Sequence, residues 1–287
     1  MLRIKIIADS TNDLSTELLA KNDIRRIPLP IILGDTGYRD GEDITPADVF
    51  RFASEGKGTP QTSAINVAEY GEIFQEELAK GAGAILHFVI SSELSSCHQN
   101  ATVAARDFDN VYPIDTMHLS TGGGWLVLYA ADLVAQGLSA REIATKCEEK
   151  KQLISTSFVL DTLEYMRRGG RCSGFTALSA GLLNIKPCLA MRGGKLGVEK
   201  KYRGSLKKVI RQYLKDKLEN QDDIDLSRAF ITHTFYDDPS FIRETVEITK
   251  ELAGFEEVLT TEAGCTVANH CGPKTLGVLF SYNSPHS

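Results

Sequence analysis

Short apolar runs and longer amphipathic stretches alternate along the first half of the chain. The apolar runs have the length and β-branched composition of buried strands, and the stretches between them repeat their apolar residues at helical spacing. The pattern predicts strands at 2–8, 84–90, 110–114 and 156–160, and helices at 46–55, 67–80, 96–107, 123–136 and 140–150. Strands that alternate with helices usually form a parallel sheet, so we expect a mainly parallel α/β domain over residues 1–154.

The pattern changes near residue 155. Two strand-like pieces, 187–191 and 197–199, flank the turn Arg-Gly-Gly-Lys (192–195) as in a β-hairpin. The remaining predicted elements are a helix at 204–219, a strand at 228–234, a helix at 239–253 and a last strand at 276–282. We therefore expect a second, mixed α+β domain over residues 155–287 that packs closely against the first, because no low-complexity linker separates them.

Two hydroxyl-rich turns precede predicted helices. One is Ser-Ser-Glu-Leu-Ser-Ser (91–96), directly after a predicted strand, and the other is Thr-Pro-Gln-Thr-Ser (59–63). Free N–H groups and the helix dipole favour an anion at a helix start, and ligands of open α/β sheets bind beyond the carboxyl ends of the strands. The residues leave two interpretations open: an anion site without a metal, or a helix cap in which Ser96 and Gln99 form a capping box.

Charge and composition exclude some classes of function. The chain of 287 residues has a net charge of -6, which argues against a nucleic-acid-binding protein. Its apolar runs are too short for a transmembrane segment, and its first residues alternate like a strand instead of resembling a signal peptide, so we expect a cytoplasmic location. The six cysteines include no Cys-x-x-Cys pair, and we expect reduced, buried thiols and no metal site.

A basic segment stands out in this acidic chain. Arg167, Arg168 and Arg171 surround a Gly-Gly turn, and Arg203 adds positive charge further along. Guanidinium groups bind carboxylate or phosphate in bidentate geometry, which suits a partner that carries a nucleotide. The alternative is a solvated helix end with basic residues at its negative pole.

Many short segments match, in order, the motifs of one protein family. They are residues 8–14, 27–29, 38–41, 62–63, 90–95, 114–116, 163–171, 186–187, 203–204 and 270–273. With these segments, the chain resembles the DegV family, the bacterial fatty-acid-binding proteins that act as the acyl-carrying subunit of a fatty-acid kinase. The segments cover nearly the whole chain, which makes the combination specific.

This resemblance implies a two-domain α/β protein that encloses one long-chain fatty acid between its domains and uses no other cofactor. Carried over onto this sequence, the ligands of the carboxylate are Thr62, Ser63, Ser95 and His270, with Ser96 beside them. The chain departs from the family pattern at Ser-Cys-His (96–98), where Gly-Thr-Tyr is usual, so the exact set of donors stays open. Candidate contacts of the acyl tail are Phe88, Leu119, Leu126, Phe158, Leu182, Leu183 and Ile231.

The resemblance also implies partners. Arg167, Arg168, Arg171 and Arg203 would dock the catalytic subunit of the fatty-acid kinase, which phosphorylates the bound acid. No transmembrane segment is expected, and lipid exchange would use a transient contact with a membrane.

Two other classes of function fit some of these residues. A serine-dependent hydrolase or acyltransferase would use Ser95 as nucleophile and His270 as base, but the chain offers no clear nucleophile elbow: segment 177–181 lacks the first glycine of that motif. A sugar- or nucleotide-binding regulatory protein fits the α/β pattern but not the set of motifs.

Overall fold

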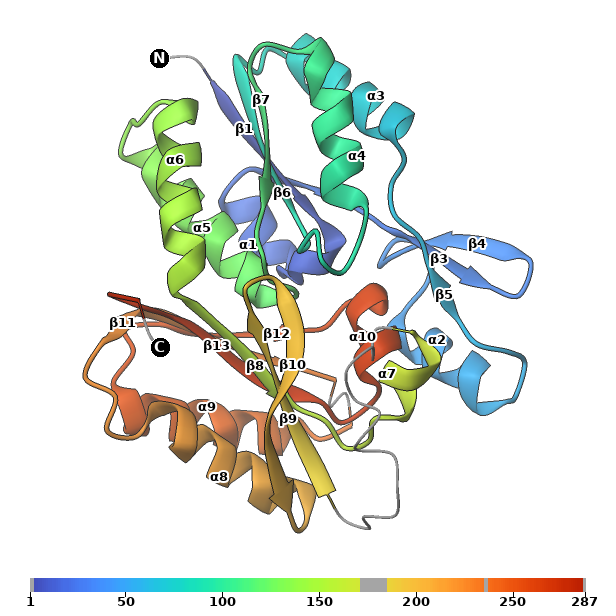
Figure 1. Cartoon of the computed structure of the whole chain (residues 1–287), viewed down its shortest axis with the longest axis vertical. Helices are drawn as coiled ribbons and strands as arrows, with labels where there is room; N and C mark the ends of the chain where they lie inside the picture. The colour runs from blue at the N-terminus through green and yellow to red at the C-terminus, as the bar shows by residue number, and fades with distance from the viewer. Residues whose placement is uncertain (1–2, 171–184, 235–236, 286–287) are drawn as a thin grey trace.

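The computed structural model describes residues 3–170, 185–234 and 237–285. Its strands form three sheets: one of four parallel strands, one of six mixed strands and a small one of three strands (Figure 1). The predicted α/β class, with a parallel sheet followed by a mixed one, is confirmed. The domain division at residues 154/155 stays a prediction.

The first sheet has the strand order β2-β1-β6-β7, and all its strands are parallel. Its strands are β1 (Ile4–Asp9), β2 (Ile24–Ile27), β6 (Ala84–Val89) and β7 (Val111–Asp115). The helices around it are α1 (Thr16–Lys21), α3 (Val67–Ala79), α4 (Cys97–Ala104), α5 (Thr121–Ala135) and α6 (Ala140–Lys150), with short 3-10 turns η1 (Ser10–Asn12), η2 (Ala105–Asp107) and η3 (Lys151–Leu153).

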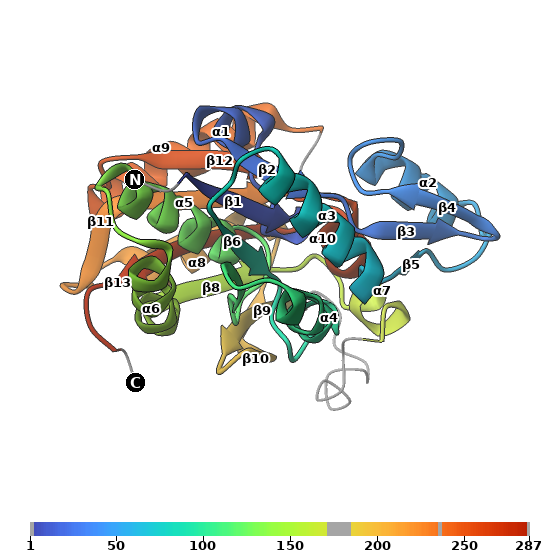
Figure 2. The same ribbon diagram turned by 90° about the horizontal axis from the view of Figure 1, so that it is seen from above.

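Alternate residues of the two central strands supply two core layers. Ile7 and Ile85 pack with α3 and α4 on one face, whereas Ile6 and Leu86 pack with α1, α5 and α6 on the other. Figure 2 shows α3 and α4 on the opposite side of this sheet from α5 and α6. Because β1 and β6 are covered on both faces, their sequences are continuous apolar runs.

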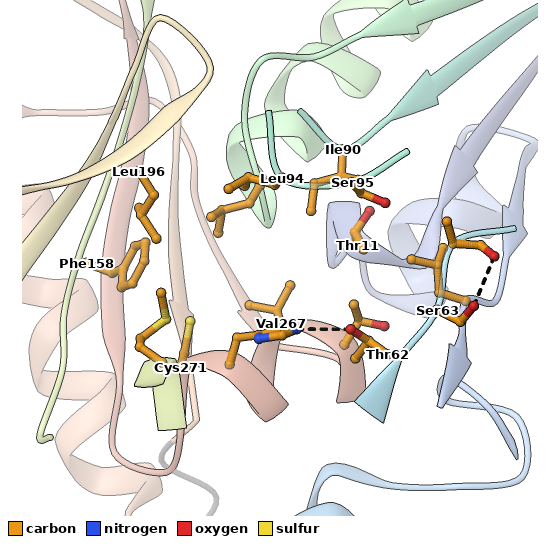
Figure 3. A pocket seen from close by; sticks show the side chains of 16 residues that line it. Thr11, Thr62, Ser63, Ile90, Leu94, Ser95, Phe158, Leu196, Val267 and Cys271 are labelled. Atoms are coloured by element: carbon orange, nitrogen blue, oxygen red, sulfur yellow. Dashed lines mark hydrogen bonds between the residues drawn. The ribbon is translucent and has the colours of Figure 1, made fainter. Parts of the chain in front are cut away.

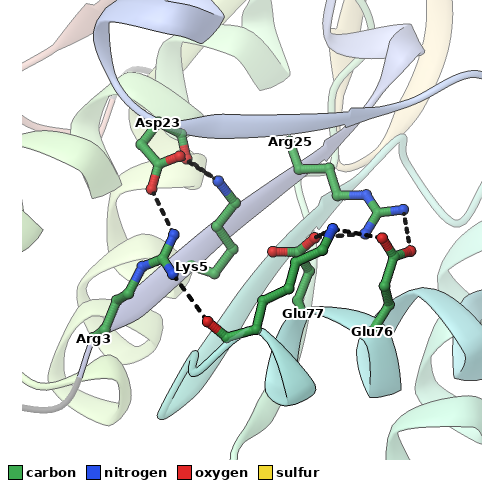
Figure 4. Close-up of polar contacts among 7 residues, drawn as sticks. Arg3, Lys5, Asp23, Arg25, Glu76 and Glu77 are labelled. Carbon is green, nitrogen blue, oxygen red and sulfur yellow. Dashed lines mark hydrogen bonds and ion pairs between the residues drawn. The ribbon is translucent and has the colours of Figure 1, made fainter.

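Ion pairs cluster where the first sheet begins. Lys5 at the start of β1 contacts Asp23 at 2.5 Å, and Arg25 of β2 contacts Glu77 of α3 at 2.6 Å (Figure 4). Lys5 and Glu77 are buried, so each needs its partner to offset the loss of water. These contacts fix α3 against the edge of the sheet, at the amino ends of the strands.

The second sheet has the order β10-β9-β8-β13-β11-β12. Its strands are β8 (Ile154–Val159), β9 (Ile185–Arg192), β10 (Lys195–Arg203), β11 (Ile224–His233), β12 (Val258–Glu262) and β13 (Leu276–Tyr282). Helices α8 (Leu206–Leu218) and α9 (Pro239–Ala253) cover one face of it. The hairpin predicted around 192–195 is present as β9 and β10.

Helix α5 lies between the two large sheets. Its residues pack in one core with β1 and β6 and with Ile154, Phe230 and Leu279 of the second sheet (Figure 1). A Cβ atom on Gly122 would lie 1.9 Å from Thr156 Oγ1, and one on Gly123 would lie 2.1 Å from Asn12 Oδ1. The Gly-Gly-Gly start of α5 therefore serves close packing and is no phosphate loop.

A small antiparallel sheet and two short helices complete the fold. They are β3 (Pro30–Leu33), β4 (Thr36–Arg39) and β5 (Gln61–Thr62), with α2 (Pro46–Ser54) beside them, and α7 (Glu164–Arg168) and α10 (Cys265–Cys271). The sequence pattern did not predict the small sheet, because strands of two to four residues show no periodicity. This sheet places β5 next to α10.

Candidate functional site

The site lies at the point where the connections of the parallel sheet change direction. From β1 the chain crosses through α1 to β2 on one side, and from β6 it crosses through α4 to β7 on the other. The carboxyl ends of β1 and β6 therefore border a crevice, which is where open α/β sheets bind their ligands. The turn after β1 contains Thr11, and the turn after β6 contains Ser95.

A cavity of about 70 Å³ occupies this crevice (Figure 3). Phe158 of β8 and Leu196 of β10 form its wall on the side of the second sheet, facing Leu94 of the turn after β6. Of the sixteen described residues that line the cavity, none is Asp, Glu, Lys or Arg. The lining residues are Thr11, Leu29, Thr62, Ser63, Ala64, Ile90, Leu94, Ser95, Leu119, Phe158, Met166, Leu196, Thr266, Val267, His270 and Cys271.

Thr62 and His270 form one polar end of this cavity. Thr62 Oγ1 lies 3.0 Å from His270 Nε2, although the two residues are 208 positions apart in the sequence. Thr62 is held because β5 pairs with Ile31 of β3, and His270 is carried by α10. Gly169 lies against the histidine ring, since a Cβ atom there would be 2.1 Å from His270 Nδ1. The ring is thus confined between α7 and β5.

The Ser95 hydroxyl ends a line of buried polar groups. Ser95 Oγ donates to Cys97 Sγ at 3.1 Å, and the thiol in turn contacts the Tyr70 hydroxyl. Tyr70 donates to one oxygen of Asp9 at 2.8 Å, and His87 Nε2 donates to the other oxygen at 2.8 Å. Burial is the main reason why the pKa values of Cys97 and Tyr70 are raised. The line therefore keeps a neutral thiol and phenol behind Ser95.

Two buried carboxylates fix the amino end of α10. Asp13 accepts a hydrogen bond from the Gly264 N–H at 2.8 Å, and Asp40 accepts from the N–H groups of Cys265 at 2.7 Å and Thr266 at 3.1 Å. Oxygen acceptors satisfy the free N–H groups of the first turn of a helix. Burial raises the pKa of Asp13 to about 8. These contacts attach the helix that carries His270 to the turns after β1 and β4.

The sequence matches one protein family along nearly its whole length. The family model described as "Uncharacterised protein, DegV family" matches residues 3–283. A DegV domain-containing protein of Caldanaerobacter subterraneus is 32% identical over 282 residues, which are 98% of this chain and 99% of the relative. The chain belongs to the DegV family. The resemblance inferred from the sequence motifs is thereby confirmed.

Solved structures of DegV family proteins have the same fold. A fatty-acid-binding DegV family protein from Thermus thermophilus superposes with a TM-score of 0.86 at 32% identity and covers 98% of this chain and 100% of its own. A stearic-acid-binding protein from Eubacterium ventriosum superposes with a TM-score of 0.83 at 25% identity, over 97% and 98% of the two chains.

Four of the five predicted carboxylate ligands of this DegV protein border the cavity. Thr62, Ser63, Ser95 and His270 lie on its surface, and the hydroxyl of Ser63 contacts the adjacent carbonyl oxygen at 3.4 Å. Ser96 is exposed and does not line the cavity, which corrects its place in the predicted set. The predicted capping box at Ser96 is also wrong, since its side chain forms no cap and Ser95 Oγ accepts from the Cys97 N–H instead.

The predicted tail contacts are only partly at the cavity. Leu119 and Phe158 line it, whereas Phe88 and Leu126 belong to the core around α5, and Ile231 belongs to the core under α8 and α9. Residues 182 and 183 lie outside the described part of the chain, as does segment 177–181. Sequence spacing identifies buried positions but does not say which buried side chains border an empty space.

The arginines of the predicted docking surface lie at the surface where they are described. Arg167 and Arg168 are exposed at the end of α7, where Arg168 forms an ion pair with Glu164, and Arg203 is exposed at the end of β10. Arg171 lies outside the described residues. Lys186 pairs with the end of β10, and its Nζ donates to the Asp161 carbonyl oxygen at 3.0 Å, just before α7. It therefore connects the end of β10, which carries Arg203, to α7, which carries Arg167 and Arg168.

Two further findings concern metals and membranes. Within residues 3–170, 185–234 and 237–285, no three side chains of His, Cys, Asp or Glu form a group that could hold a metal ion. Five cysteines in this part of the chain are free and buried. In the same residues, the helices are too short or too polar to cross a membrane.

The sequence analysis missed Thr11 and Thr266, two further hydroxyl residues at the cavity. Thr11 lies within the 8–14 segment that matches the family, and that match gave no reason to assign it a role. Its signal was available in part, because it directly follows the first predicted strand of a parallel sheet, at the end where ligands bind.

Proposed function

We propose that this DegV protein binds one long-chain fatty acid. The acyl tail lies in the cavity between the two large sheets, and the carboxylate is held by Thr62, Ser95 and His270. One observation carries the proposal: an apolar cavity that ends in two hydroxyls and an imidazole from three separate elements, without an acidic or strongly basic side chain among its described lining. Relatives that are named for binding fatty acids share the fold and, in Thermus thermophilus, 32% of the sequence.

The energetics of such a site divide between tail and head group. Each buried methylene contributes about 0.8 kcal/mol, so a long tail supplies most of the affinity. The carboxylate loses its water and must be fully hydrogen-bonded, which sets the orientation of the acid. The observed volume of about 70 Å³ is small for an acyl chain. Since typical ligand pockets have roughly 300–1,000 Å³, the cavity must widen when the acid enters.

We further propose that the protein presents the carboxylate to the catalytic subunit of a fatty-acid kinase and takes no part in the chemistry itself. Arg167, Arg168, Arg171 and Arg203 form the docking surface, which suits a partner that carries a nucleotide. His270 bonds Thr62 and Ser95 bonds Cys97, so Ser95 is not paired with a base as a serine nucleophile would be. Exchange of the acid takes place in the cytoplasm, through a transient contact with a membrane.

Mass spectrometry tests the binding step. The protein purified from a bacterial host and then denatured should release one fatty acid per chain. Ser95→Ala and His270→Ala should each weaken binding of a long-chain acid about tenfold, because each removes one hydrogen bond to a charged group. Ser92→Ala is the control, since Ser92 is exposed in the same turn and does not line the cavity. A protein without lipid that hydrolyses an activated ester through Ser95 would refute the proposal.

A kinase assay tests the docking step separately. Replacement of Arg167 and Arg168 by Glu should leave acid binding unchanged and reduce phosphorylation of the bound acid, because both residues are exposed and neither lines the cavity. Replacement of Arg106 and Arg141 by Glu, at exposed positions in η2 and on α6, controls for the same change in net charge. Loss of the acid in the double variant would show that this end of α7 belongs to the cavity wall instead.

A further inference from the structure

Thr11 is a buried hydroxyl residue that borders the cavity and is left unsatisfied. Its side chain is 1% exposed, and its Oγ1 has no hydrogen-bond partner among the described residues. A buried hydroxyl without a partner costs free energy, whereas valine would have the same shape without that cost. Figure 3 shows Thr11 at the edge of the cavity beside Ser95. A ligand in the cavity that accepts from this hydroxyl would offset the cost.

The backbone around Thr11 is fixed on both sides. Ser10 donates to Asp40 at 3.0 Å, and the Asn12 amide donates to the Phe88 carbonyl oxygen at 3.1 Å. Both neighbours are thus tied to parts of the fold that lie outside the cavity, which leaves Thr11 as the residue of this turn that faces it. A donor held in this way is already in position before the ligand arrives.

The topology explains why this hydroxyl lies where a ligand binds. Thr11 follows β1 and Ser95 follows β6, and these neighbouring strands border the point where the connections change direction. The two hydroxyls therefore face the same crevice from its two sides, while Thr62 and His270 come from β5 and α10. The family motifs give a role to Ser95, on the β6 side of the crevice. They give none to Thr11, on the β1 side.

We propose that Thr11 is a direct ligand of the fatty-acid carboxylate, donating from Oγ1 on the β1 side of the crevice. This inference rests on the proposed function. Thr11 adds a donor from a fourth element, η1. The carboxylate would then be bound between the turns after β1 and β6. The same carboxylate would bind less well after any change that removes the hydroxyl but keeps the shape of the residue.

Binding of palmitate to the delipidated full-length protein tests the inference. Thr11→Val should weaken palmitate binding about tenfold and weaken binding of methyl palmitate much less, because the ester oxygens are uncharged acceptors. Thr11→Ser keeps the hydroxyl and should retain the affinity of the unchanged protein. The melting temperature of the ligand-free Thr11→Val protein should stay the same or rise, because an unsatisfied hydroxyl has been removed. Thr11→Ala repeats the test if the valine variant does not fold.

Thr249→Val serves as the matched control, because the Thr249 hydroxyl donates to the Thr245 carbonyl oxygen at 2.8 Å on α9, away from the cavity. It should lower the melting temperature and leave palmitate binding intact. Normal palmitate binding by Thr11→Val, together with weakened binding by Ser95→Ala, would overturn the role of Thr11 and leave the proposed function intact. Equal affinity of the unchanged protein for palmitate and methyl palmitate would refute the proposed carboxylate site as well. Equal losses for both ligands in Thr11→Val would indicate a structural role and also overturn the inference.

Discussion

The properties of Ser95 depend on residues behind it that never touch the cavity. Its hydroxyl donates to Cys97, and the contacts continue through Tyr70 to Asp9, which also accepts from His87. Hydrogen bonds arranged in a line polarise one another, and each member fixes the orientation of the next. When an acid binds, Ser95 must turn its proton from the thiol to the carboxylate. The thiol is a weak acceptor, so this exchange costs little.

Tyr70→Phe tests this line of contacts. The substitution removes one donor to the buried carboxylate of Asp9, and we expect the free energy of unfolding to fall by about 1–3 kcal/mol. Acid binding should weaken less than in Ser95→Ala, because Ser95 itself remains. Urea denaturation and calorimetry measure the two effects. Tyr112→Phe, at a half-buried position on β7, is the control. Unchanged stability in Tyr70→Phe would mean that Asp9 does not depend on the phenol.

Among the elements, α10 connects the proposed carboxylate site to the rest of the fold. It carries His270 and lies between β5 and α7, and its amino end is fixed by Asp13 and Asp40, from the turns after β1 and β4. A helix of seven residues has little stability of its own, so these tertiary contacts determine its position. Substitutions at either end of α10 should therefore weaken acid binding even where the substituted residue does not contact the acid.

Gly169→Ala tests the carboxyl end of α10. The added Cβ would lie 2.1 Å from His270 Nδ1, so the ring has to move and its contact with Thr62 is lost. The backbone of Gly169 is in the helical region, with φ of -75°, and alanine is compatible with it. We expect about tenfold weaker binding of a long-chain acid and a folded protein. Gly71→Ala, where a Cβ meets open space, should bind normally. Normal binding by Gly169→Ala would contradict the role of the ring.

Asp13→Asn tests the amino end of α10 through its pH dependence. Burial raises the pKa of Asp13 from 3.8 to about 8, so the folded protein holds a proton that the unfolded chain releases above pH 4. The free energy of unfolding of the unchanged protein should therefore fall between about pH 4 and pH 8 and level off above, relative to Asp13→Asn. Urea denaturation of both proteins at several pH values measures the difference. A constant difference would show that Asp13 is ionised in the folded state.

The sequence predicts helix starts well where a side chain caps the backbone of a residue close by in the chain. Thr45 and Ser139 form capping boxes with Asp48 and Glu142, each three residues further along the chain. Ser96 has similar spacing but does not cap, because Ser95 accepts the Cys97 N–H in its place. The contact of Asp40 with Thr266 spans 226 positions, and no periodicity reports such a distance. The unsatisfied state of Thr11 is likewise a property of the folded protein alone.

The two large sheets together define the space for the tail. The cavity lies where the carboxyl ends of the parallel strands meet β8 and β10 of the second sheet. A smaller cavity of about 20 Å³ adjoins it and shares Leu119, Phe158, Val267 and Cys271 with it. Thr232 and Thr275 line its far side. Their hydroxyls are hydrogen-bonded to other protein groups, so an apolar tail that extends beyond Phe158 would meet mainly apolar surface in this smaller cavity.

A series of saturated acids of increasing length tests how the lobes bury the tail. If each added methylene leaves water completely, it contributes about 0.8 kcal/mol, and the dissociation constant should fall about fourfold per carbon. The gain should stop at the length that fills the space between the sheets, because further carbons would meet polar groups or solvent. Titration calorimetry of acids with even chain lengths measures both the slope and the length at which it ends. Ser95→Ala should shift every affinity by the same factor and leave the slope unchanged, since it alters only the head group. An affinity that does not depend on chain length would contradict burial of the tail between the two sheets.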